Sequence, residues 1–386
     1  MSVVEGRVVL VAGGTGGHVF PARAVAVELL ARGHTLAFVT DNRGEGYGAS
    51  IVKLDTYRLK AGNVARGNLL GRIKALLDIA SGWWEARAIL REIRPSVVVG
   101  FGGYPALPTM VAALQAKVPT VIHEQNAVLG RVNRSLAPYV DAIALSFPDT
   151  ERLENRFAHK TVVTGNPVRP DIVPLRAAAF PAPAADGPLH LFVMGGSQGA
   201  TALSTVTPQG LALLPADIRA RLRVSAQCRR EDIDAARAAY AAAGIEARCS
   251  TFFDDVTAEL GRTHVAITRA GASTVSELAA IGRPSILVPY PHATDDHQSA
   301  NARALAAAGG AIVLAQNDFT PAALASRLAD WLSSPAILTA TAARARAVGT
   351  PDAASRLADL IDRVAPKSGA RKSDARLAAG AREARA

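Results

Sequence analysis

Short apolar runs recur along the first half of the chain, and each is followed by a stretch of helix-compatible composition. The runs interpreted as β-strands occupy residues 8–12, 35–40, 97–100, 120–123, 142–145 and 161–164. Strand-length runs that alternate with helical segments are typical of βα units around a parallel sheet. Residues 1–166 are therefore predicted to form one α/β domain.

The same alternation begins again in the second half. A stretch with six prolines (Pro167, Pro170, Pro174, Pro181, Pro183 and Pro188) lacks periodicity and is interpreted as a linker. Further strands are predicted at 189–194, 224–227, 265–268, 285–289 and 311–314, and a last helix at about 353–364. Residues 167–349 are thus predicted to form a second α/β domain.

One stretch imitates a membrane span, because no charged residue occurs between Arg94 and Lys117. It contains Gly100, Gly102, Gly103, Pro105 and Pro108, and glycine and proline punctuate local structure strongly. A strand, a glycine loop and a buried helix explain it better than a transmembrane helix. The short first apolar run, 8–12, also argues against a secretory signal.

Composition fits a globular α/β protein of two domains: 386 residues, 49% hydrophobic and 20% charged. The net charge is +10, of which residues 367–386 supply +4 through six basic and two acidic side chains. This tail is interpreted as disordered. The remaining charge suits anionic lipid as well as nucleic acid. The two cysteines, Cys228 and Cys249, are expected to be reduced thiols.

Two glycine-rich turns echo each other, Gly13–His18 and Gly195–Gly199, and each directly follows a predicted strand. Such turns let a ligand approach the backbone and place it at a helix N-terminus. The echo predicts two Rossmann-like halves that face a shared cleft. A nicotinamide enzyme is the rival interpretation, since Asp41 ends the second strand. However, Val19 stands where the dinucleotide fingerprint needs Gly or Ala.

Polar residues also follow other predicted strands, where ligands bind in doubly wound sheets. In the segment 268–277, Thr274 and Glu277 have capping-box spacing, so Glu277 either caps a helix or binds the ribose of a nucleotide. The other polar segments are 123–126, 165–169 and 295–301. A zinc site at His292 and His297 lacks further ligands. Asp232 and Asp234 are interpreted as a solvated helix face, and no metal or cofactor is expected.

Eight segments in this order resemble the MurG family, the GlcNAc transferases of peptidoglycan synthesis: GGTGGHVFPA, FGGYPALP, HEQNAVLGRVNR, GNPVR, GGSQGA, FFDDV, TRAGASTVSE and DHQSANA. The resemblance spans about residues 7–364. It implies the GT-B fold, with a C-terminal helix at about 350–366 returning to the first domain. It also implies inverting transfer of GlcNAc from UDP-GlcNAc to the C4 hydroxyl of MurNAc in undecaprenyl-diphosphate-MurNAc-pentapeptide.

The resemblance further implies roles for individual residues. His18 matches the proposed catalytic base, with Glu124 as a second catalytic candidate. The residues that it assigns to UDP-GlcNAc are Thr15, Gly16, Gly17, Asn126, Arg169, Ser197, Phe253, Ala272, Ser273, Thr274, Val275, Glu277 and Gln298. Phe253 is bulkier than the aliphatic residue common there, and the basic tail lies outside the usual family core.

Because the acceptor has a polyprenyl tail, the enzyme must meet a membrane. One apolar helical face comprises Leu69, Leu70, Ile73, Leu76, Leu77, Ala80 and Trp84, with Trp83 and basic residues nearby. This face either packs into the core or docks on anionic lipid. The family implies a peripheral protein on the cytoplasmic face of the bacterial cell membrane, with possible partners among division and elongation proteins.

Two alternatives remain beside lipid-linked GlcNAc transfer. One is another GT-B enzyme, such as a UDP-sugar epimerase or a natural-product glycosyltransferase. The other is a basic membrane- or nucleic-acid-binding module without catalysis, which would make the polar strand ends incidental. The HEQN and GGSQG segments together argue against the first, and we expect no nucleic-acid partner.

Overall fold

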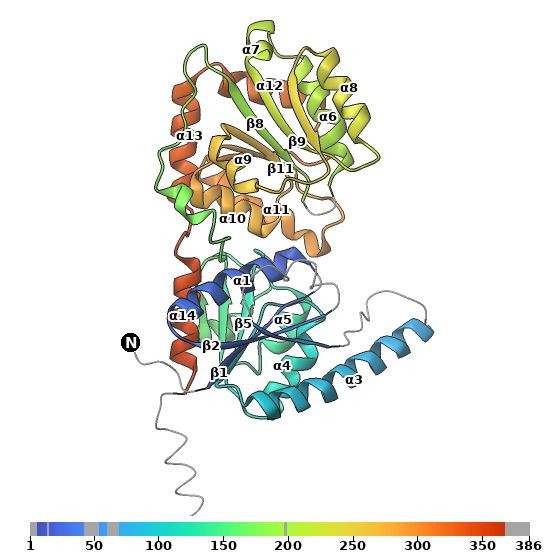
Figure 1. The fold of residues 1–386 in the computed structure, drawn as a ribbon, viewed down its shortest axis with the longest axis vertical. Helices are drawn as coiled ribbons and strands as arrows, with labels where there is room; N and C mark the ends of the chain where they lie inside the picture. The colour runs from blue at the N-terminus through green and yellow to red at the C-terminus, as the bar shows by residue number, and fades with distance from the viewer. Residues whose placement is uncertain (1–5, 14, 42–53, 60–68, 197–198, 367–386) are drawn as a thin grey trace, which may run out of the picture. The chain divides into compact units, whose positions relative to one another are not determined.

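The computed structural model describes residues 6–13, 15–41, 54–59, 69–196 and 199–366, and for residues 69–79 it describes the backbone only. The chain divides into two compact units (Figure 1). One comprises Met1–Pro167 and Asp352–Ala386, and the other Val168–Pro351.

The first unit is built on a seven-stranded sheet in which every neighbouring pair is parallel, in the order β3-β2-β1-β4-β5-β6-β7. Its strands are β1 (Arg7–Val11), β2 (Thr35–Thr40), β3 (Asp55–Arg58), β4 (Val97–Gly100), β5 (Thr120–Glu124), β6 (Ala142–Leu145) and β7 (Thr161–Val163). Its helices are α1 (Gly16–Ala31), α3 (Leu69–Ile93), α4 (Ala106–Gln115), α5 (Arg131–Leu136), the 3₁₀ helix η1 (Asn155–Lys160) and α14 (Ala353–Val364).

Strand β1 shows how this sheet separates two apolar layers. Successive side chains of a strand point to opposite faces. Val8 and Leu10 pack with side chains of α1 and α14, whereas Val9 and Val11 pack with side chains of α3 and α4. All four are fully buried. A sheet that is covered on both faces explains why its strands read as continuous apolar runs.

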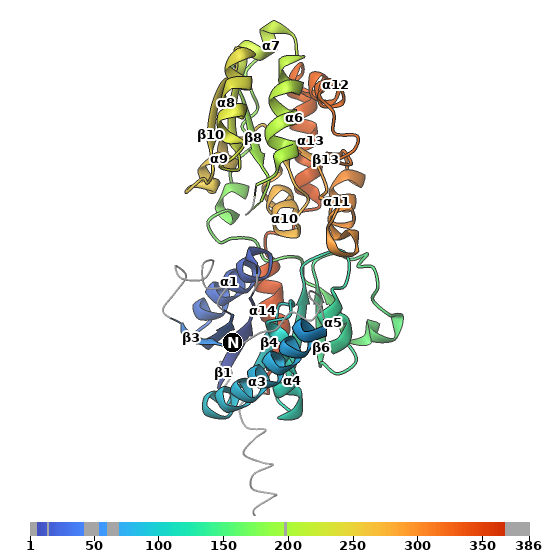
Figure 2. The ribbon, with the colours of Figure 1, turned by 90° about the vertical axis from the view of Figure 1, so that its right-hand side faces the viewer.

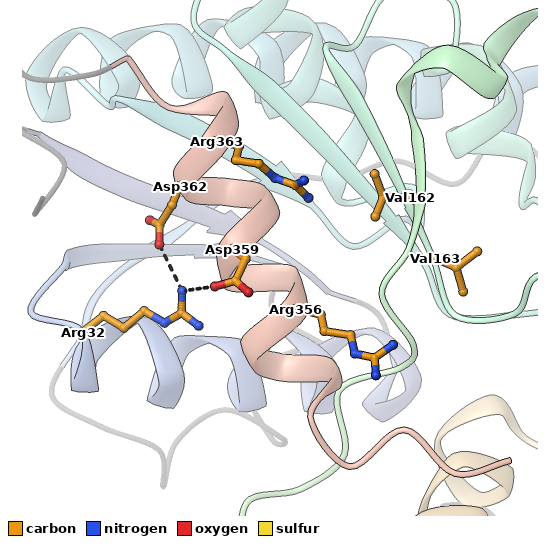
Figure 3. A pocket seen from close by; sticks show the side chains of 7 residues that line it. All are labelled: Arg32, Val162, Val163, Arg356, Asp359, Asp362 and Arg363. Atoms are coloured by element: carbon orange, nitrogen blue, oxygen red, sulfur yellow. Dashed lines mark hydrogen bonds and ion pairs between the residues drawn. The ribbon is translucent and has the colours of Figure 1, made fainter. Parts of the chain in front are cut away.

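Arg32, at the C-cap of α1, fastens the C-terminal helix α14 to the first unit (Figure 3). Its guanidinium binds Asp359 at 2.6 Å and Asp362 at 3.1 Å, and donates to the hydroxyl of Ser355 at 2.7 Å. The apolar side of α14, which includes Leu357 and Ile361, is buried against α1. Arg32, Asp359 and Asp362 also line a cavity of about 500 Å³, and the ion pairs between them hold the helix at its edge.

The second unit repeats the architecture with six parallel strands, in the order β10-β9-β8-β11-β12-β13. Strands β8, β10 and β13 of this sheet are labelled in Figure 2. The strands are β8 (Leu189–Met194), β9 (Leu222–Gln227), β10 (Glu246–Ser250), β11 (Val265–Thr268), β12 (Ser285–Leu287) and β13 (Ala311–Val313). The helices are α6 (Thr201–Ala212), α7 (Ala216–Arg221), α8 (Ile233–Ala242), α9 (Val256–Arg262), α10 (Ala272–Ile281), α11 (His297–Ala307), α12 (Pro321–Leu332) and α13 (Pro335–Ala347), with the 3₁₀ helices η2 (Val173–Arg176) and η3 (Thr294–Asp296).

The two parallel sheets confirm the prediction of two Rossmann-like domains. Every strand predicted from an apolar run is present, within two residues at either end. The uncharged stretch forms β4, a glycine loop and α4, as predicted. In the described part of the chain, no helix combines the length and the apolar character that a membrane crossing requires.

The interpretation of the proline-rich stretch as a linker is wrong in part. Residues 173–176 form η2, and Ile172 before it is fully buried in the core of the second unit. Arg176 donates to the backbone oxygens of Ala280 at 2.7 Å and Arg346 at 3.2 Å. Prolines limit regular structure here, but these contacts fix the segment to its unit.

Candidate active site

The loop after β1 places His18 in the first turn of α1. Thr15 is the N-cap residue with extended backbone, and its side chain makes no capping hydrogen bond in the described structure. Thr15 and Gly17 are exposed, whereas Gly16 is buried. A Cβ atom at Gly16 would lie 2.8 Å from the Phe20 ring, so a larger residue here would require the ring to move. The open backbone N–H groups and the positive end of the helix can face an anion or a polar sugar.

The imidazole of His18 begins a chain of hydrogen bonds that runs into the protein. Its Nδ1 lies 2.8 Å from Oε1 of Gln125, and Nε2 of Gln125 lies 2.9 Å from Nδ1 of His123. Nε2 of His123 lies 3.1 Å from the backbone oxygen of Gly165. His123 is fully buried and Gln125 nearly so. Burial lowers the pKa of His123 to about 4, so this ring is neutral at pH 7.

Glu124 points its carboxylate into its own loop. Oε1 accepts from the backbone N–H of Asn126 at 3.0 Å and from its side-chain amide at 3.1 Å. Oε2 accepts from the backbone N–H of Gly130 and from Nδ2 of Asn133, both at 2.8 Å. Four N–H donors thus occupy the two oxygens of this carboxylate. Glu124 therefore fixes the loop that contains Asn126.

In the second unit, Arg169 and Glu277 form a bidentate ion pair. Nε donates to Oε1 at 2.7 Å and Nη2 donates to Oε2 at 3.0 Å. The side chains retain 19% and 6% of their exposure. Burial raises the pKa of the Glu277 carboxyl, and the paired guanidinium opposes that rise.

The capping interpretation of Glu277 is wrong. Helix α10 begins at Ala272 with Gly271 as its N-cap residue, so Thr274 lies inside the helix and Glu277 further along it. A capping box needs the acidic residue three positions after the N-cap. The first turn of the helix consists of Ala272, Ser273, Thr274 and Val275. In the described structure no side chain caps the helix at Gly271.

An unsatisfied hydroxyl lies at this helix start. Oγ of Ser273 is buried and has no hydrogen-bond partner among the described residues. Oγ1 of Thr268, at the end of β11, is in the same condition. Buried polar groups without partners are uncommon and call for a physical explanation. Next to a helix N-terminus, a bound phosphate would supply the missing acceptor.

Gln298 and Phe253 complete the described candidates of the second unit. Oε1 of Gln298 accepts from the backbone N–H groups of Ala270 at 3.2 Å and Tyr290 at 2.9 Å, which leaves its NH₂ group to meet a ligand. Phe253 is buried edge-on against Phe192, with ring centroids 5.6 Å apart. This edge-to-face contact fixes the Phe253 side chain in the core, and with it the position of the backbone at this residue. Ser197 lies outside the described residues.

The sequence interpretation did not include Gln125 or His123 among the site residues, although it noted their segment as a polar strand end. The available signal was four polar residues in succession after a buried strand.

Asp41 is buried, and its Oδ1 would lie 2.7 Å from a Cβ atom at Gly13. Asp232 is ion-paired with Arg229 and Asp234 is largely exposed.

Comparisons with known proteins cover almost the whole chain. The model of the glycosyltransferase family 28 N-terminal domain matches residues 8–145, and that of the family 28 C-terminal domain matches residues 190–363. A UDP-N-acetylglucosamine–N-acetylmuramyl-(pentapeptide) pyrophosphoryl-undecaprenol N-acetylglucosamine transferase of Rhodospirillum rubrum is 52% identical over 93% of this chain and 92% of its own. The protein of the same description in Paramagnetospirillum magneticum is 50% identical, over 96% and 100%.

Among solved structures, the crystal structure of Acinetobacter baumannii MurG is similar to this chain. It superposes with a TM-score of 0.74 at 31% sequence identity. The match covers 92% of this chain and 99% of that one.

Proposed function

The chain belongs to glycosyltransferase family 28, and from that premise we propose that it transfers GlcNAc from UDP-GlcNAc to undecaprenyl-diphosphate-MurNAc-pentapeptide in peptidoglycan synthesis. The observation that supports this most is identity of about half the residues over nearly the full length of transferases so described. The two parallel-sheet domains are those of the GT-B fold. The enzyme is a UDP-GlcNAc-dependent N-acetylglucosaminyltransferase.

The proposed chemistry is a single displacement with inversion at the anomeric carbon. The C4 hydroxyl of MurNAc attacks C1 of GlcNAc, the bond from C1 to the diphosphate oxygen breaks, and its electron pair leaves with UDP. His18 takes the proton of the attacking hydroxyl, as general-base histidines do. The geometry favours His18 over Glu124 for this role, because four N–H donors already occupy the carboxylate of Glu124.

The second unit is proposed to bind the donor. The start of α10, from Ala272 to Val275, offers backbone N–H groups and the Ser273 hydroxyl to the diphosphate, where negative charge grows as UDP leaves. Arg169 adds positive charge and holds Glu277, whose carboxylate oxygens can accept from the ribose hydroxyls. The backbone at Phe253 would bind uracil. Ser197 would contact the UDP, and Gln298 would donate its amide to the sugar.

The first unit is proposed to contribute the acceptor side of the reaction. Thr15, Gly16 and Gly17 would lie near the acceptor diphosphate and the donor sugar, where α1 begins. Asn126, held by Glu124, would contact the GlcNAc. Each of these residues follows the carboxyl end of a parallel strand, where ligands bind in such sheets.

The lipid-linked acceptor also implies contact with an anionic membrane surface on the cytoplasmic face. Gly82, Ala86 and Leu90 form the buried stripe of α3, whereas Ala80 and Trp84 are exposed, Trp84 to 64%. Both belong to the apolar face identified in the sequence, and the other members lie where side chains are not described. Exposed tryptophan next to basic residues suits a membrane interface. Roles in cell shape and division, with partner proteins, belong to the same proposal.

The membrane contact can be measured by flotation with vesicles that contain phosphatidylglycerol. Trp84→Ser is expected to reduce vesicle binding. Leu213→Ser, which removes a side chain 60% exposed in the second unit, is the matched control and should not change it. Equal binding of the two variants would contradict docking through α3.

The decisive assay is transfer of radiolabelled GlcNAc from UDP-GlcNAc to a lipid-linked MurNAc-pentapeptide analogue. The wild-type protein should form the disaccharide product, and His18→Ala should lower kcat while leaving UDP binding nearly unchanged. Turnover of UDP-GlcNAc without the acceptor would point instead to an epimerase. Near-normal turnover by His18→Ala would remove His18 as the base.

A further inference from the structure

The amide of Gln125 has only one orientation that satisfies its neighbours. Its Nε2 lies 2.9 Å from the backbone oxygen of His123, which can only accept a hydrogen bond. The NH₂ end of the amide must therefore face His123, and Oε1 must face His18. Exchange of the two ends would set a carboxamide oxygen against a backbone oxygen in a buried site, at a cost of an unmet hydrogen bond.

This orientation determines where the proton of neutral His18 lies. Oε1 of Gln125 can only accept, and it stands 2.8 Å from Nδ1 of His18. Nδ1 must then carry the hydrogen and donate it. In the neutral ring the lone pair is left on Nε2, since one ring nitrogen donates and the other accepts.

The far end of the chain of contacts agrees with this assignment. The backbone oxygen of Gly165 requires that Nε2 of His123 carry a hydrogen. Nδ1 of His123 is then the acceptor for the second N–H of Gln125, at 2.9 Å. A neutral His123 is essential, because a proton on Nδ1 would face the NH₂ group of Gln125. Complete burial keeps the ring neutral at pH 7.

The residue beside the Nε2 edge of His18 is a glycine, Gly103. Gly103 has φ of +75°, and a Cβ atom there would lie 3.2 Å from Cδ2 and 3.3 Å from Nε2 of His18. Both the left-handed backbone and the short distances favour glycine at this position. Nε2 of His18, which carries the lone pair, therefore lies beside a residue that has no side chain.

We propose that Gln125, supported by His123, is a positioning residue that holds His18 in the Nδ1–H tautomer, so that Nε2 can take the proton of the acceptor hydroxyl. The inference rests on the proposed function for its chemical meaning. As the bond to C1 of GlcNAc forms and UDP leaves, the proton moves to Nε2 while Nδ1–H stays bonded to Oε1. A buried carboxylate holds the histidine of the Ser-His-Asp triad in a comparable way. Here a neutral amide selects the tautomer without adding charge.

Nitrogen NMR of the full-length protein with ¹⁵N-labelled histidine measures the tautomer directly, with or without turnover. In the neutral form of the ring, His18 should show a protonated Nδ1 and a bare Nε2. Its signals are assigned by their loss in His18→Gln. A wild-type His18 with the proton on Nε2 overturns the proposal, whatever the variants do.

Two substitutions separate the role of the acceptor oxygen from packing. Gln125→Met removes the oxygen at similar length, and should abolish the tautomer preference and lower kcat roughly 10- to 100-fold, with KM for UDP-GlcNAc nearly unchanged. Gln125→Glu keeps an acceptor beside Nδ1 of His18 and should restore the Nδ1–H tautomer, but its second oxygen replaces the donor that faces His123, so stability should fall. A folded Gln125→Met protein with the wild-type tautomer and kcat overturns the proposal.

Gln115→Met is the matched control, because Gln115 is exposed in the same unit and accepts only the indole N–H of Trp83 in the described contacts. It should alter neither the His18 signals nor kcat. The test also separates the two proposals. The predicted tautomer in a wild-type protein that transfers no GlcNAc would refute the proposed function and leave the hydrogen-bonded arrangement intact.

Discussion

Arg169 and Glu277 are 108 residues apart in the sequence, yet they form a two-pronged ion pair in which both partners are largely buried. Arg169 follows the junction of the two units and Glu277 lies on α10. The pair therefore fixes the beginning of the second unit to the helix whose start is the proposed diphosphate site. Such a pair also restricts the conformations of the two side chains that are proposed to face UDP.

Removal of one partner should leave the other charge buried and unpaired. Glu277→Ala is therefore expected to lower the free energy of unfolding by about 3 kcal/mol and to weaken UDP-GlcNAc binding. The double variant Arg169→Met/Glu277→Leu should regain most of the stability without regaining binding. Urea unfolding and calorimetric titration measure the two quantities. A single variant as stable as the wild type would contradict the energetic importance of the pair.

The orphan hydroxyl of Ser273 offers a test in which stability and binding separate. Because Oγ has no partner in the described structure, Ser273→Ala should leave stability unchanged or slightly raised. If a phosphate oxygen accepts from this hydroxyl, UDP-GlcNAc binding should weaken about 10-fold. Ser285→Ala is the matched control, since Oγ of Ser285 in β12 is also buried and unpartnered there. Equal affinities of the two variants would exclude the hydroxyl from the donor site.

The buried His123 should make stability depend on pH. Its pKa is about 4 in the folded protein, below the ordinary value of about 6.5. Between these values the unfolded chain binds more protons, so stability falls as the pH drops from 7 to 4, by about 3 kcal/mol from this group. Below pH 4 the loss levels off.

Urea unfolding at pH 7 and at pH 4 measures this contribution. The decrease in the wild-type protein should exceed the decrease in His123→Gln, and comparison of the two differences removes effects common to both. His264, whose pKa burial also lowers to about 4, contributes equally to both proteins. His159→Gln, at an exposed position, should behave as the wild type. Identical pH dependence with and without His123 would show that the ring does not remain neutral.

Arg32 should matter more than its neighbour Arg356, although both line the cavity of Figure 3. The Arg32 side chain is 10% exposed and binds Glu28, Asp359 and Asp362. Arg32→Ala should lower the free energy of unfolding by about 2 kcal/mol, because three carboxylates lose a partly buried partner.

Arg356 pairs only with Asp352 in the described contacts, and both side chains are 51% exposed. Arg356→Ala is therefore the control, with an expected effect below about 0.5 kcal/mol. Thermal unfolding at low and high salt gives both values. A smaller effect for Arg32→Ala than for Arg356→Ala would mean that apolar packing alone holds α14.

Two strands at sheet edges could not be predicted from the pattern of apolar residues. Strands β3 and β10 were not predicted, and both lie at the edge of a sheet. Three of the four residues in β3 are exposed, and β10 contains Glu246 and Arg248. Central strands are buried on both faces and read as apolar runs, whereas β3 and β10 have mostly polar or exposed positions and are recognised only by the neighbours with which they pair.

The buried position of Ile172 illustrates a second limit. From 167 to 188 the sequence contains six prolines and no periodic pattern, which is why it was interpreted as a linker. The structure places Ile172 in the same apolar cluster as residues of α10 and α11. A few buried side chains, among them Val168 and Ile172, and a few hydrogen bonds to the backbone hold the segment, and such contacts leave no periodic pattern in the sequence.

The sequence by itself determined the two α/β domains, most of their strands and the family to which the chain belongs. Apolar runs and glycine-rich turns consist of consecutive residues, so they can be recognised without the tertiary structure. Only the tertiary structure decided what the polar strand ends do. Glu277 is the partner of Arg169 rather than a cap, and Glu124 binds its own loop. The orientation of His18 depends on Gln125, His123 and Gly165. Hydrogen-bond direction is a property of groups that folding brings together, so no spacing within the chain could reveal it.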